Sequence, residues 1–251
     1  MDIPQGAVSV LDQGFVRLVD FMGGDLAVVQ AARVSYASQS KGIDADKKLI
    51  NYLLKHDHMT PFEQTVFKFH VSCPIFVMRQ WIRHRMASYN EISGRYTEVK
   101  DEFYIPKNWR GQDVKNKQGS VVASEIDHAE LTRIFDEQVR ACYATYQQLL
   151  QKGAAREMAR MILPLNNYTQ FYWTINARSL MNFTALRADV HAQWEIQKYA
   201  EALAAFFENK MPWTFAAFLE NVWCGKNPIL DARKRELMPD VEGKRLSPLE
   251  Q

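Results

Sequence analysis

Three segments with strand-like patterns, separated by helical segments of unequal length, limit the folds open to this chain. Residues 14–22 and 168–175 are rich in apolar and aromatic side chains, and residues 66–73 alternate between apolar and polar. Because the helical segments between them lack the regular spacing of strand-helix-strand repeats, an α+β fold is predicted rather than a doubly wound parallel sheet. We expect a small mixed or antiparallel sheet, packed by several long helices, in a single domain over residues 1–251.

The expected helices begin at capping residues or prolines. Asp25 is predicted to cap a helix that runs to about Ala37, and Asp189 a helix that runs through Ala204. Thr60 and Glu63 have the spacing of a capping box, with proline between them at the first helical position. Further helical patterns cover residues 44–55, 74–82, 124–152, 156–160, 176–187 and 213–223. The core is expected to span about 14–223, with a loop near 100–119 and a tail at 224–251.

Composition restricts the function classes. The chain has 251 residues, of which 47% are hydrophobic, and a formal net charge of +2, so it can bury a large core and has no broad basic field for nucleic acid. Its three cysteines, Cys73, Cys142 and Cys224, are far apart and form no C-x-x-C pair, which fits a reducing compartment. Without an N-terminal signal pattern or an apolar run of ~18 residues, a soluble cytoplasmic protein without membrane partners is expected.

The densest group of chemically active residues lies between Arg83 and Tyr96. Arg83, His84 and Arg85 follow a predicted helix, where cations stabilise the carboxyl end of the helix dipole, so a purely structural role is open for them. The positions after them add hydroxyl, amide, carboxylate, glycine and arginine groups in a predicted loop: Ser88, Asn90, Glu91, Ser93, Gly94 and Arg95. Such groups form anion sites, because arginine donates paired hydrogen bonds and glycine lets the backbone approach a ligand. The residues alone favour a ligand that contains phosphate.

The same run, R-H-R-x-x-S-x-N-x-x-S-x-R-Y, resembles the signature of the flavin-dependent (alternative) thymidylate synthases at every specified position. Residues 56–63, 176–183, 186–189 and 191–195 resemble the same family, so that the resemblance covers about 14–223. It implies a homotetramer with active sites shared between subunits. It also implies FAD and NADPH as cofactors and 5,10-methylenetetrahydrofolate as cosubstrate. The implied reaction methylates C5 of dUMP to give dTMP, without a covalent cysteine nucleophile.

The resemblance also implies residue roles. Flavin contacts are implied for Ser35, His58, Thr60, Glu63, Arg83, His84, Arg85, Asn90, Glu91, Asn176, Arg178, Asn182 and His191. Contacts to dUMP are implied for Gln80, Arg83, Glu91, Ser93, Gly94, Arg95, Arg160 and Arg187. Arg187 and Ser93 are the candidate catalytic residues. A fixed cation at Arg187 near the pyrimidine edge favours ionisation at N3, which makes C5 more nucleophilic.

Several of these residues also allow a purely structural interpretation. Arg160 has the spacing for a surface ion pair with Glu157, and Arg187 has the position of a helix C-terminal cap. His191 is interpretable as a polar residue in the first turn of a helix. Cys73, in an apolar stretch, has the character of a core residue rather than a nucleophile.

Two rival functions are weaker. The pair His56-Asp57 suggests a metal-dependent nucleotide phosphohydrolase, but the remaining histidines and carboxylates lack ligand spacing, and no metal is expected. A nucleic-acid-binding module predicts a broad basic face, whereas 31 basic and 29 acidic residues nearly balance.

Overall fold

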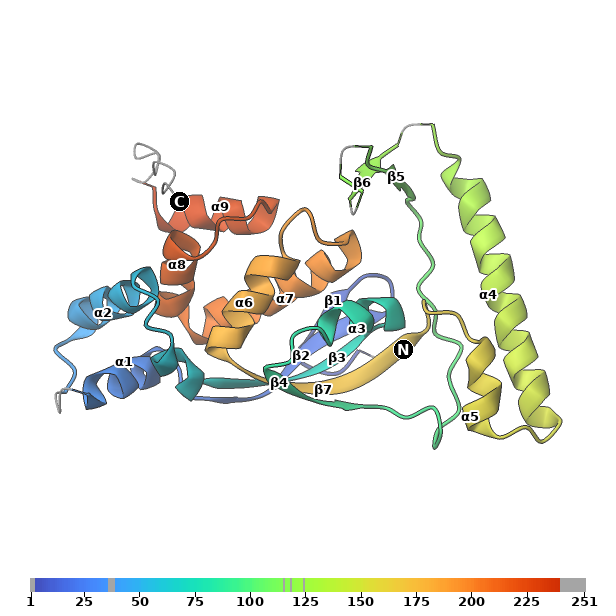
Figure 1. Ribbon diagram of the computed structural model, residues 1–251, viewed down its shortest axis with the longest axis horizontal. Helices are drawn as coiled ribbons and strands as arrows, with labels where there is room; N and C mark the ends of the chain where they lie inside the picture. Colours follow the sequence, from blue (N-terminus) through green and yellow to red (C-terminus); the bar gives the residue numbers. More distant parts are fainter. Residues whose placement is uncertain (1–2, 36–38, 115, 118, 124, 240–251) are drawn as a thin grey trace.

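A five-stranded sheet forms the centre of the protein, which we describe from a computed structural model over residues 3–35, 39–114, 116–117, 119–123 and 125–239. Its strand order is β1-β2-β3-β7-β4, and every pairing is antiparallel (Figure 1). The strands are β1 (Ala7–Val10), β2 (Gly14–Met22), β3 (Val66–Pro74), β4 (Ala87–Glu91) and β7 (Tyr168–Asn176). The predicted α+β class and antiparallel sheet are confirmed.

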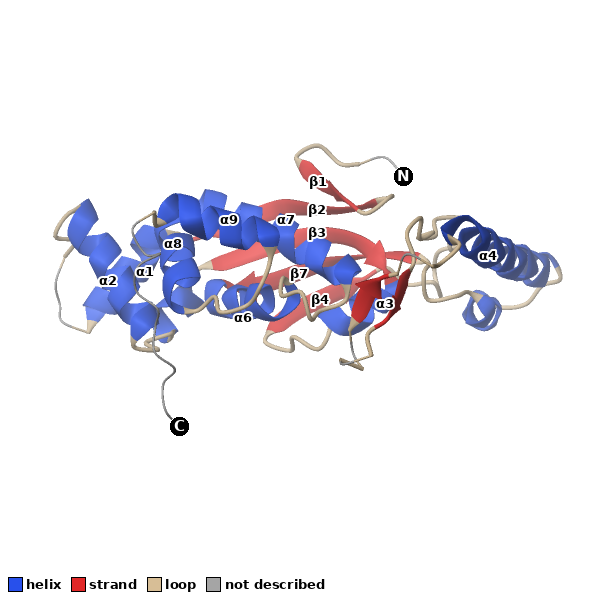
Figure 2. Cartoon of the chain, turned by 90° about the horizontal axis from the view of Figure 1, so that it is seen from above, coloured by secondary structure: helices blue, strands red, loops and turns tan. Residues whose placement is uncertain are grey.

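Helices cover one face of this sheet. They are α3 (Ile75–Trp81), α6 (Ala177–Arg187) and α7 (Trp194–Lys210), which lie across the strands in Figure 2. On β7 the side chains of Phe171, Trp173 and Ile175 are buried, while Tyr172 between them is 38% exposed. This alternation places one row of side chains against the helices and the other on the uncovered face of the sheet.

A second group of helices lies at one end of the sheet. It contains α1 (Asp25–Val34), α2 (Ile43–Lys55), the 3-10 turn η1 (Thr60–Gln64), α8 (Pro212–Asn221) and α9 (Pro228–Leu237). No helix among the described residues is long and apolar enough to cross a membrane.

An arm extends from the other end (Figure 1). It contains α4 (His128–Gln151), α5 (Arg156–Ala159), η2 (Arg160–Ile162) and a hairpin of β5 (Arg110–Gln112) and β6 (Ser120–Val122). Only Val139 and Tyr146 are buried along the 24 residues of α4. The Tyr146 hydroxyl accepts a hydrogen bond from the Val99 amide at 3.0 Å, which ties the arm to the segment after β4.

Three predicted capping residues act differently. Asp25 lies inside α1, and its carboxylate accepts hydrogen bonds from the Trp213 and Thr214 amides at 2.9 Å, so it caps α8 instead. Thr60 is inside η1, where Met59 is the N-cap and makes no side-chain bond. Asp189 lies before α7, which begins at Trp194 after the N-cap Gln193. The predicted helix ends at Ala37 and Ser124 fall outside the described residues.

Several elements were not predicted. Strand β4 occupies part of the expected loop after Arg85, because its backbone pairs with β7 although its side chains are mostly polar. Strands β5 and β6 lie within and just after the expected loop at 100–119, β1 precedes the expected core, and α9 lies within the segment expected as a tail. The C-terminal segment contributes the buried Leu230 to the hydrophobic core.

Candidate active site

One cavity of about 260 Å³ lies where β4 ends. Four of the predicted nucleotide-binding residues line it: Glu91, Ser93, Gly94 and Arg160. The β4–β7 pairing places Glu91 opposite Phe171, and the chain then turns through residues 92–94 beside η2. Glu91 accepts a hydrogen bond from the Thr169 hydroxyl at 2.6 Å, which fixes its carboxylate at the cavity wall. The structure therefore assembles this part of the predicted site from β4, β7 and η2.

Gly94 and Arg160 form part of the cavity wall, and Arg95 follows Gly94 outside it. A Cβ atom at Gly94 would lie 3.4 Å from the Arg160 Cδ atom, so the missing side chain permits the close approach of Arg160. The Arg95 Nε atom donates to Glu157 at 3.1 Å, and both side chains are more than half exposed. Glu157 is therefore the partner of Arg95, and the ion pair with Arg160 that the helical spacing suggested is not among the ion pairs of the described residues.

A second cluster joins the end of α3 to the end of α6. Arg187, the last residue of α6, donates from Nε to the His84 Nε2 atom at 2.9 Å and from Nη2 to the Gln80 carbonyl at 3.2 Å. These contacts go to α3 and to the turn after it, so Arg187 does not act as a cap for its own helix. The His84 ring packs against Phe183 at 4.7 Å between centroids, which further restricts its orientation.

Electrostatics in this cluster follow from burial. Burial and, secondarily, the Arg187 charge lower the pKa of His84 to about 4, so the imidazole is neutral at pH 7 and its Nε2 lone pair accepts the Arg187 proton. Burial and the nearby Arg83 charge lower the pKa of Arg187. Arg187 has no carboxylate partner among the described residues, so its positive charge is not compensated by the protein.

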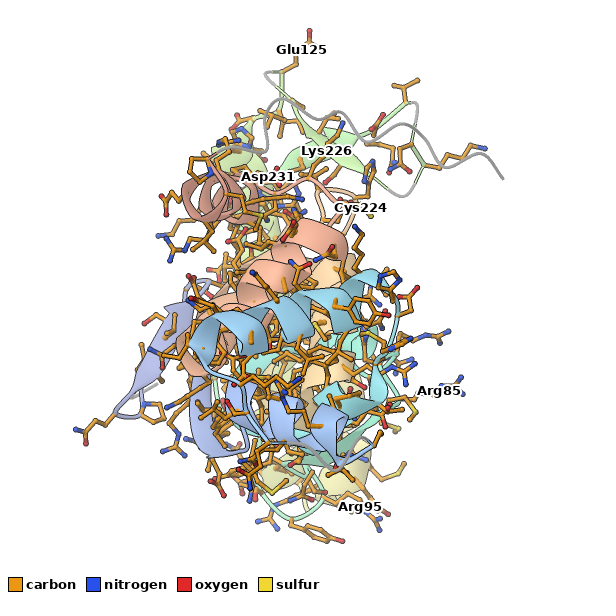
Figure 3. All side chains as sticks on the ribbon, turned by 90° about the vertical axis from the view of Figure 1, so that its left-hand side faces the viewer. Arg85, Arg95, Glu125, Cys224, Lys226 and Asp231 are labelled. Carbon is orange, nitrogen blue, oxygen red and sulfur yellow. The ribbon has the colours of Figure 1, made fainter. Side chains whose placement is uncertain are left out.

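Tyr89, and not the side chains of Arg83 to Arg85, contacts the carbonyl groups at and just after the end of α3. The Tyr89 hydroxyl lies 3.1 Å from the Trp81 carbonyl oxygen and 2.8 Å from that of His84. Arg83 and Arg85 are exposed, and Figure 3 shows Arg85, like Arg95, projecting away from the ribbon. These arginines are therefore accessible to a ligand or to another chain.

The register of β4 against β7 shows on which face of the sheet Asn90 lies. Asn90 pairs in register with Tyr172, and Tyr172 in turn pairs with His70, on the face that the helices leave uncovered. Ala87 and Tyr89 occupy the alternate positions and pack against the core. Asn90 is therefore presented on the opposite side from the Arg187 cluster.

The predicted flavin contacts at the start of α6 form a third group. Arg178 donates to Glu63 at 2.5 Å, and Asn182, one turn further along, is exposed. The Asn176 side chain accepts from the Ser179 amide at 2.9 Å and thus serves as the N-cap of α6.

A larger open cavity of about 1010 Å³ lies between α1, α2 and η1. It is lined by Ser35, His58 and Thr60, three residues predicted to contact flavin, and by Lys48 and Tyr52. The Tyr52 ring lies against His58, with 5.9 Å between centroids. Aromatic rings beside hydroxyl groups and a lysine suit a planar ligand that carries negative charge.

Most wall residues of the smaller cavity, Thr169 and Gln170 among them, are not site residues that the sequence predicts. Thr169 and Gln170 lie on β7, for which the sequence predicts only a core strand. The two consecutive polar residues at the start of this strand are the available signal. His191, by contrast, precedes α7 and is exposed, so it is not in the first turn of a helix.

The structure also shows where possible metal ligands and the Cys73 thiol lie. Among the described residues, no group of three histidine, cysteine or acidic side chains is close enough to hold a metal ion. Cys73 is fully buried on β3, and burial raises the pKa of its thiol well above the ordinary range. As predicted from its apolar context, it is a core residue.

Comparison with known proteins identifies the class first. Residues 17–213 match the model of a family described as thymidylate synthase complementing protein. A UMP/dUMP methylase, PolB from Streptomyces cacaoi, solved with 5-Br dUMP, superposes with a TM-score of 0.79 at 34% identity over 87% of this chain and all of that one. Fold, site and these matches define an α+β enzyme of the nucleotide methyltransferase class.

The curated relatives name the family. The flavin-dependent thymidylate synthases of Thermosipho africanus and of a strain of Thermus thermophilus are 54% and 51% identical to this chain. The alignments cover 86% and 96% of this chain, and 95% and 90% of the relatives. The chain belongs to the flavin-dependent thymidylate synthase family.

Proposed function

We propose that the chain methylates C5 of dUMP to give dTMP, with FAD, NADPH and 5,10-methylenetetrahydrofolate. The observation that carries this proposal is the environment of the Arg187 side chain. Its guanidinium is half-buried and is held by two neutral acceptors, the His84 ring and the Gln80 carbonyl. A cation held in this way is available to stabilise negative charge on a ligand, because no protein carboxylate within the described residues neutralises it.

The nucleotide fits the two clusters by its chemistry. Ser93, the backbone at Gly94 and the guanidinium groups of Arg95 and Arg160 would hold the phosphate. Arg187 would face the uracil edge, where a fixed cation favours loss of the N3 proton and raises electron density at C5. Gln80, Arg83 and Glu91 would orient the nucleotide, and Ser93 is proposed as the second catalytic residue. The related methylase was solved with a halogenated dUMP, which supports this ligand class.

The flavin fits the cationic and polar groups that remain. Arg83, His84, Arg85, Asn90 and Glu91 would hold it with Glu63, Asn176, Arg178, Asn182 and His191 and, at the larger cavity, Ser35, His58 and Thr60. Exposed guanidinium groups at Arg85 and Arg178 suit its diphosphate, since arginine binds such oxygens with paired hydrogen bonds. When bound there and reduced by NADPH, the flavin would supply the hydride equivalent needed to convert the transferred one-carbon unit into a methyl group.

We propose a homotetramer in which neighbouring subunits complete each site. On one chain, the cavity that contains Ser93 and Arg160 is lined by none of Thr60, Glu63 and Arg178. The exposed position of Arg85 suits contact with a ligand that another subunit also binds. Light scattering would measure the oligomeric state. Mixing two inactive variants, one changed at Arg160 and the other at Arg178, would test whether sites are shared. Restored activity supports shared sites, and no restored activity contradicts them.

The proposed reaction uses no covalent cysteine. The buried Cys73 thiol, with its raised pKa, is unsuited to form a thiolate. Cys73→Ala is therefore expected to keep turnover close to that of the wild type. Loss of turnover in a variant whose thermal unfolding is unchanged would contradict this part of the proposal.

The visible spectrum of the purified protein tests the function directly. A flavin absorbance that bleaches anaerobically with NADPH, followed by formation of dTMP on addition of dUMP and methylenetetrahydrofolate, is expected. A colourless protein that gains no flavin on incubation with FAD would overturn the proposal. UMP in place of dUMP is the informative second substrate, because the related methylase is described as acting on both.

A further inference from the structure

We propose that Asp189 is a positioning residue, which holds the His191 ring in one orientation with Nδ1 turned to the protein and Nε2 left for the ligand. Neither residue lies in a regular element: both belong to the turn between Arg187, which ends α6, and Trp194, which begins α7. This inference rests on the proposed function only in that the ligand of His191 is taken to be the flavin.

Three hydrogen bonds fix the Asp189 carboxylate. Its Oδ1 atom accepts from the His191 amide at 2.9 Å and lies 2.5 Å from the His191 Nδ1 atom, while Oδ2 accepts from the Lys226 amide at 2.8 Å. The Asp189 side chain is 18% exposed, whereas that of His191 is 69% exposed. A held acid therefore contacts an accessible imidazole.

The charge of Asp189 decides the tautomer of His191. Burial acts to raise the pKa of Asp189, but the hydrogen bonds from His191 and Lys226 outweigh it and lower the pKa, so Asp189 is an ionised carboxylate at neutral pH. An ionised carboxylate only accepts hydrogen bonds, and therefore the His191 Nδ1 atom must carry a proton. The Nε2 atom on the far side of the ring is the one left for a ligand.

The C-terminal segment holds Asp189 in place. The Val190 amide donates to the Lys226 carbonyl at 2.9 Å, and the Asn227 side chain donates to the Ala188 carbonyl at 2.8 Å. Gly225 permits this approach, because a Cβ atom there would lie 2.7 Å from Asp189 Oδ2. Figure 3 shows Lys226 on this segment, close to the labelled Cys224. The segment after α8 thus supports the turn that follows the candidate catalytic Arg187.

Asp231 provides a matched control in the same segment. Its carboxylate accepts from the Trp223 indole at 2.9 Å and from the Asn227 amide at 3.0 Å, with no contact to His191. Asp231→Asn therefore weakens the C-terminal segment and leaves the His191 partner intact. Asp189→Asn removes the negative charge. It also places an NH₂ group opposite an N–H of His191 or Lys226, where a carboxylate oxygen now accepts a hydrogen bond.

The test compares flavin affinity in Asp189→Asn, His191→Gln, the double variant and Asp231→Asn. Asp189→Asn is expected to weaken FAD binding roughly tenfold, since hydrogen bonds to charged groups have that order of effect. The double variant should bind no more weakly than His191→Gln alone, because Asp189 acts through His191. Asp231→Asn should keep the wild-type affinity. Wild-type affinity in Asp189→Asn, or additive losses in the double variant, would overturn the proposal.

A second readout needs no flavin. Long-range ¹H–¹⁵N spectra of histidine-labelled protein, with His191 assigned from His191→Gln, should show a protonated Nδ1 in the wild type and in Asp231→Asn. Asp189→Asn should release the ring to exchange between tautomers. An unprotonated Nδ1 in the wild type would overturn the proposal even where flavin chemistry is found. The expected tautomer in a protein that binds no flavin would refute the proposed function and leave the positioning role intact.

Discussion

The two arginine clusters of the candidate site differ in how the protein treats their charge. Arg187 is half-buried and its hydrogen bonds within the described residues go to neutral acceptors, whereas Arg95 is exposed and paired with Glu157. A half-buried cation without a carboxylate partner costs stability, and a role in binding a negatively charged ligand accounts for keeping it there. An exposed pair contributes little to stability and exchanges its partner readily. The comparison predicts chemistry at Arg187 and nucleotide binding at the rim of the smaller cavity.

The largest effect should come from Arg187→Ala. Turnover of dUMP is expected to fall about a hundredfold or more, because one preorganised charge is lost from the site. Flavin content should be kept, since the variant removes a proposed pyrimidine contact. Steady-state rates and the flavin absorbance measure the two effects.

Arg187→Lys sharpens that result. Lysine keeps the charge but lacks the planar fork that contacts His84 and Gln80 together, so turnover should stay well below that of the wild type. Near-normal turnover in either variant would remove Arg187 from the catalytic list.

Arg160→Ala should act on binding. The KM for dUMP is expected to rise about tenfold or more with a small change in kcat, since a phosphate contact is removed. Arg156→Ala is the matched control, because Arg156 lies on the preceding turn and pairs with Glu98 at 3.5 Å. Equal changes in the two variants would show that the cavity rim binds by general charge alone.

His84 should make folding stability depend on pH. Its pKa is about 4 in the folded protein against an ordinary 6.5, so the unfolded chain binds more protons between these values. The free energy of unfolding should therefore fall as the pH drops from about 6.5 to 4, and His84→Asn should lose this component. Denaturant unfolding at several pH values measures it, and identical slopes in both proteins would contradict the assignment.

Glu157→Gln should have the smallest effect. The pair with Arg95 is exposed on both sides, so the free energy of unfolding is expected to change by less than about 1 kcal/mol. Denaturant titration checks this value. A loss of several kcal/mol would show that the Arg95–Glu157 pair stabilises the fold. Arg95 and Arg187 would then no longer differ in the way proposed.

The sequence predicted the fold best where burial is periodic. Strands β2, β3 and β7 follow from their apolar patterns, since one face of each packs against helices. Strand β4 was not predicted, because its backbone pairs with β7 at the sheet edge while Ser88 and Asn90 point away from the core. Hydrogen bonding across an edge leaves little hydrophobic signal in the sequence.

The kinds of residue in the candidate site could be predicted from the sequence, but their contacts in space could not. The segment from Ser93 to Arg95 suggested an anion site on chemistry alone, and the structure places its first two residues in one cavity with Arg160. Asp25 accepts from Thr214 and Asp189 accepts from Lys226, both distant in sequence. Local capping rules therefore failed for both carboxylates, because Asp25 caps α8 and Asp189 lies in the turn before α7. Long-range partners of this kind follow from tertiary packing, which no local pattern encodes.

The indole pair beneath the Arg187 cluster has an optical consequence. Trp81 and Trp173 are fully buried, with 5.2 Å between ring centroids, and both rings contact Phe183, which also packs against His84. Their emission is therefore that of indoles shielded from water. A flavin placed beside His84 would accept their excitation energy, so the native fluorescence of this protein can report occupancy of the site without any attached label.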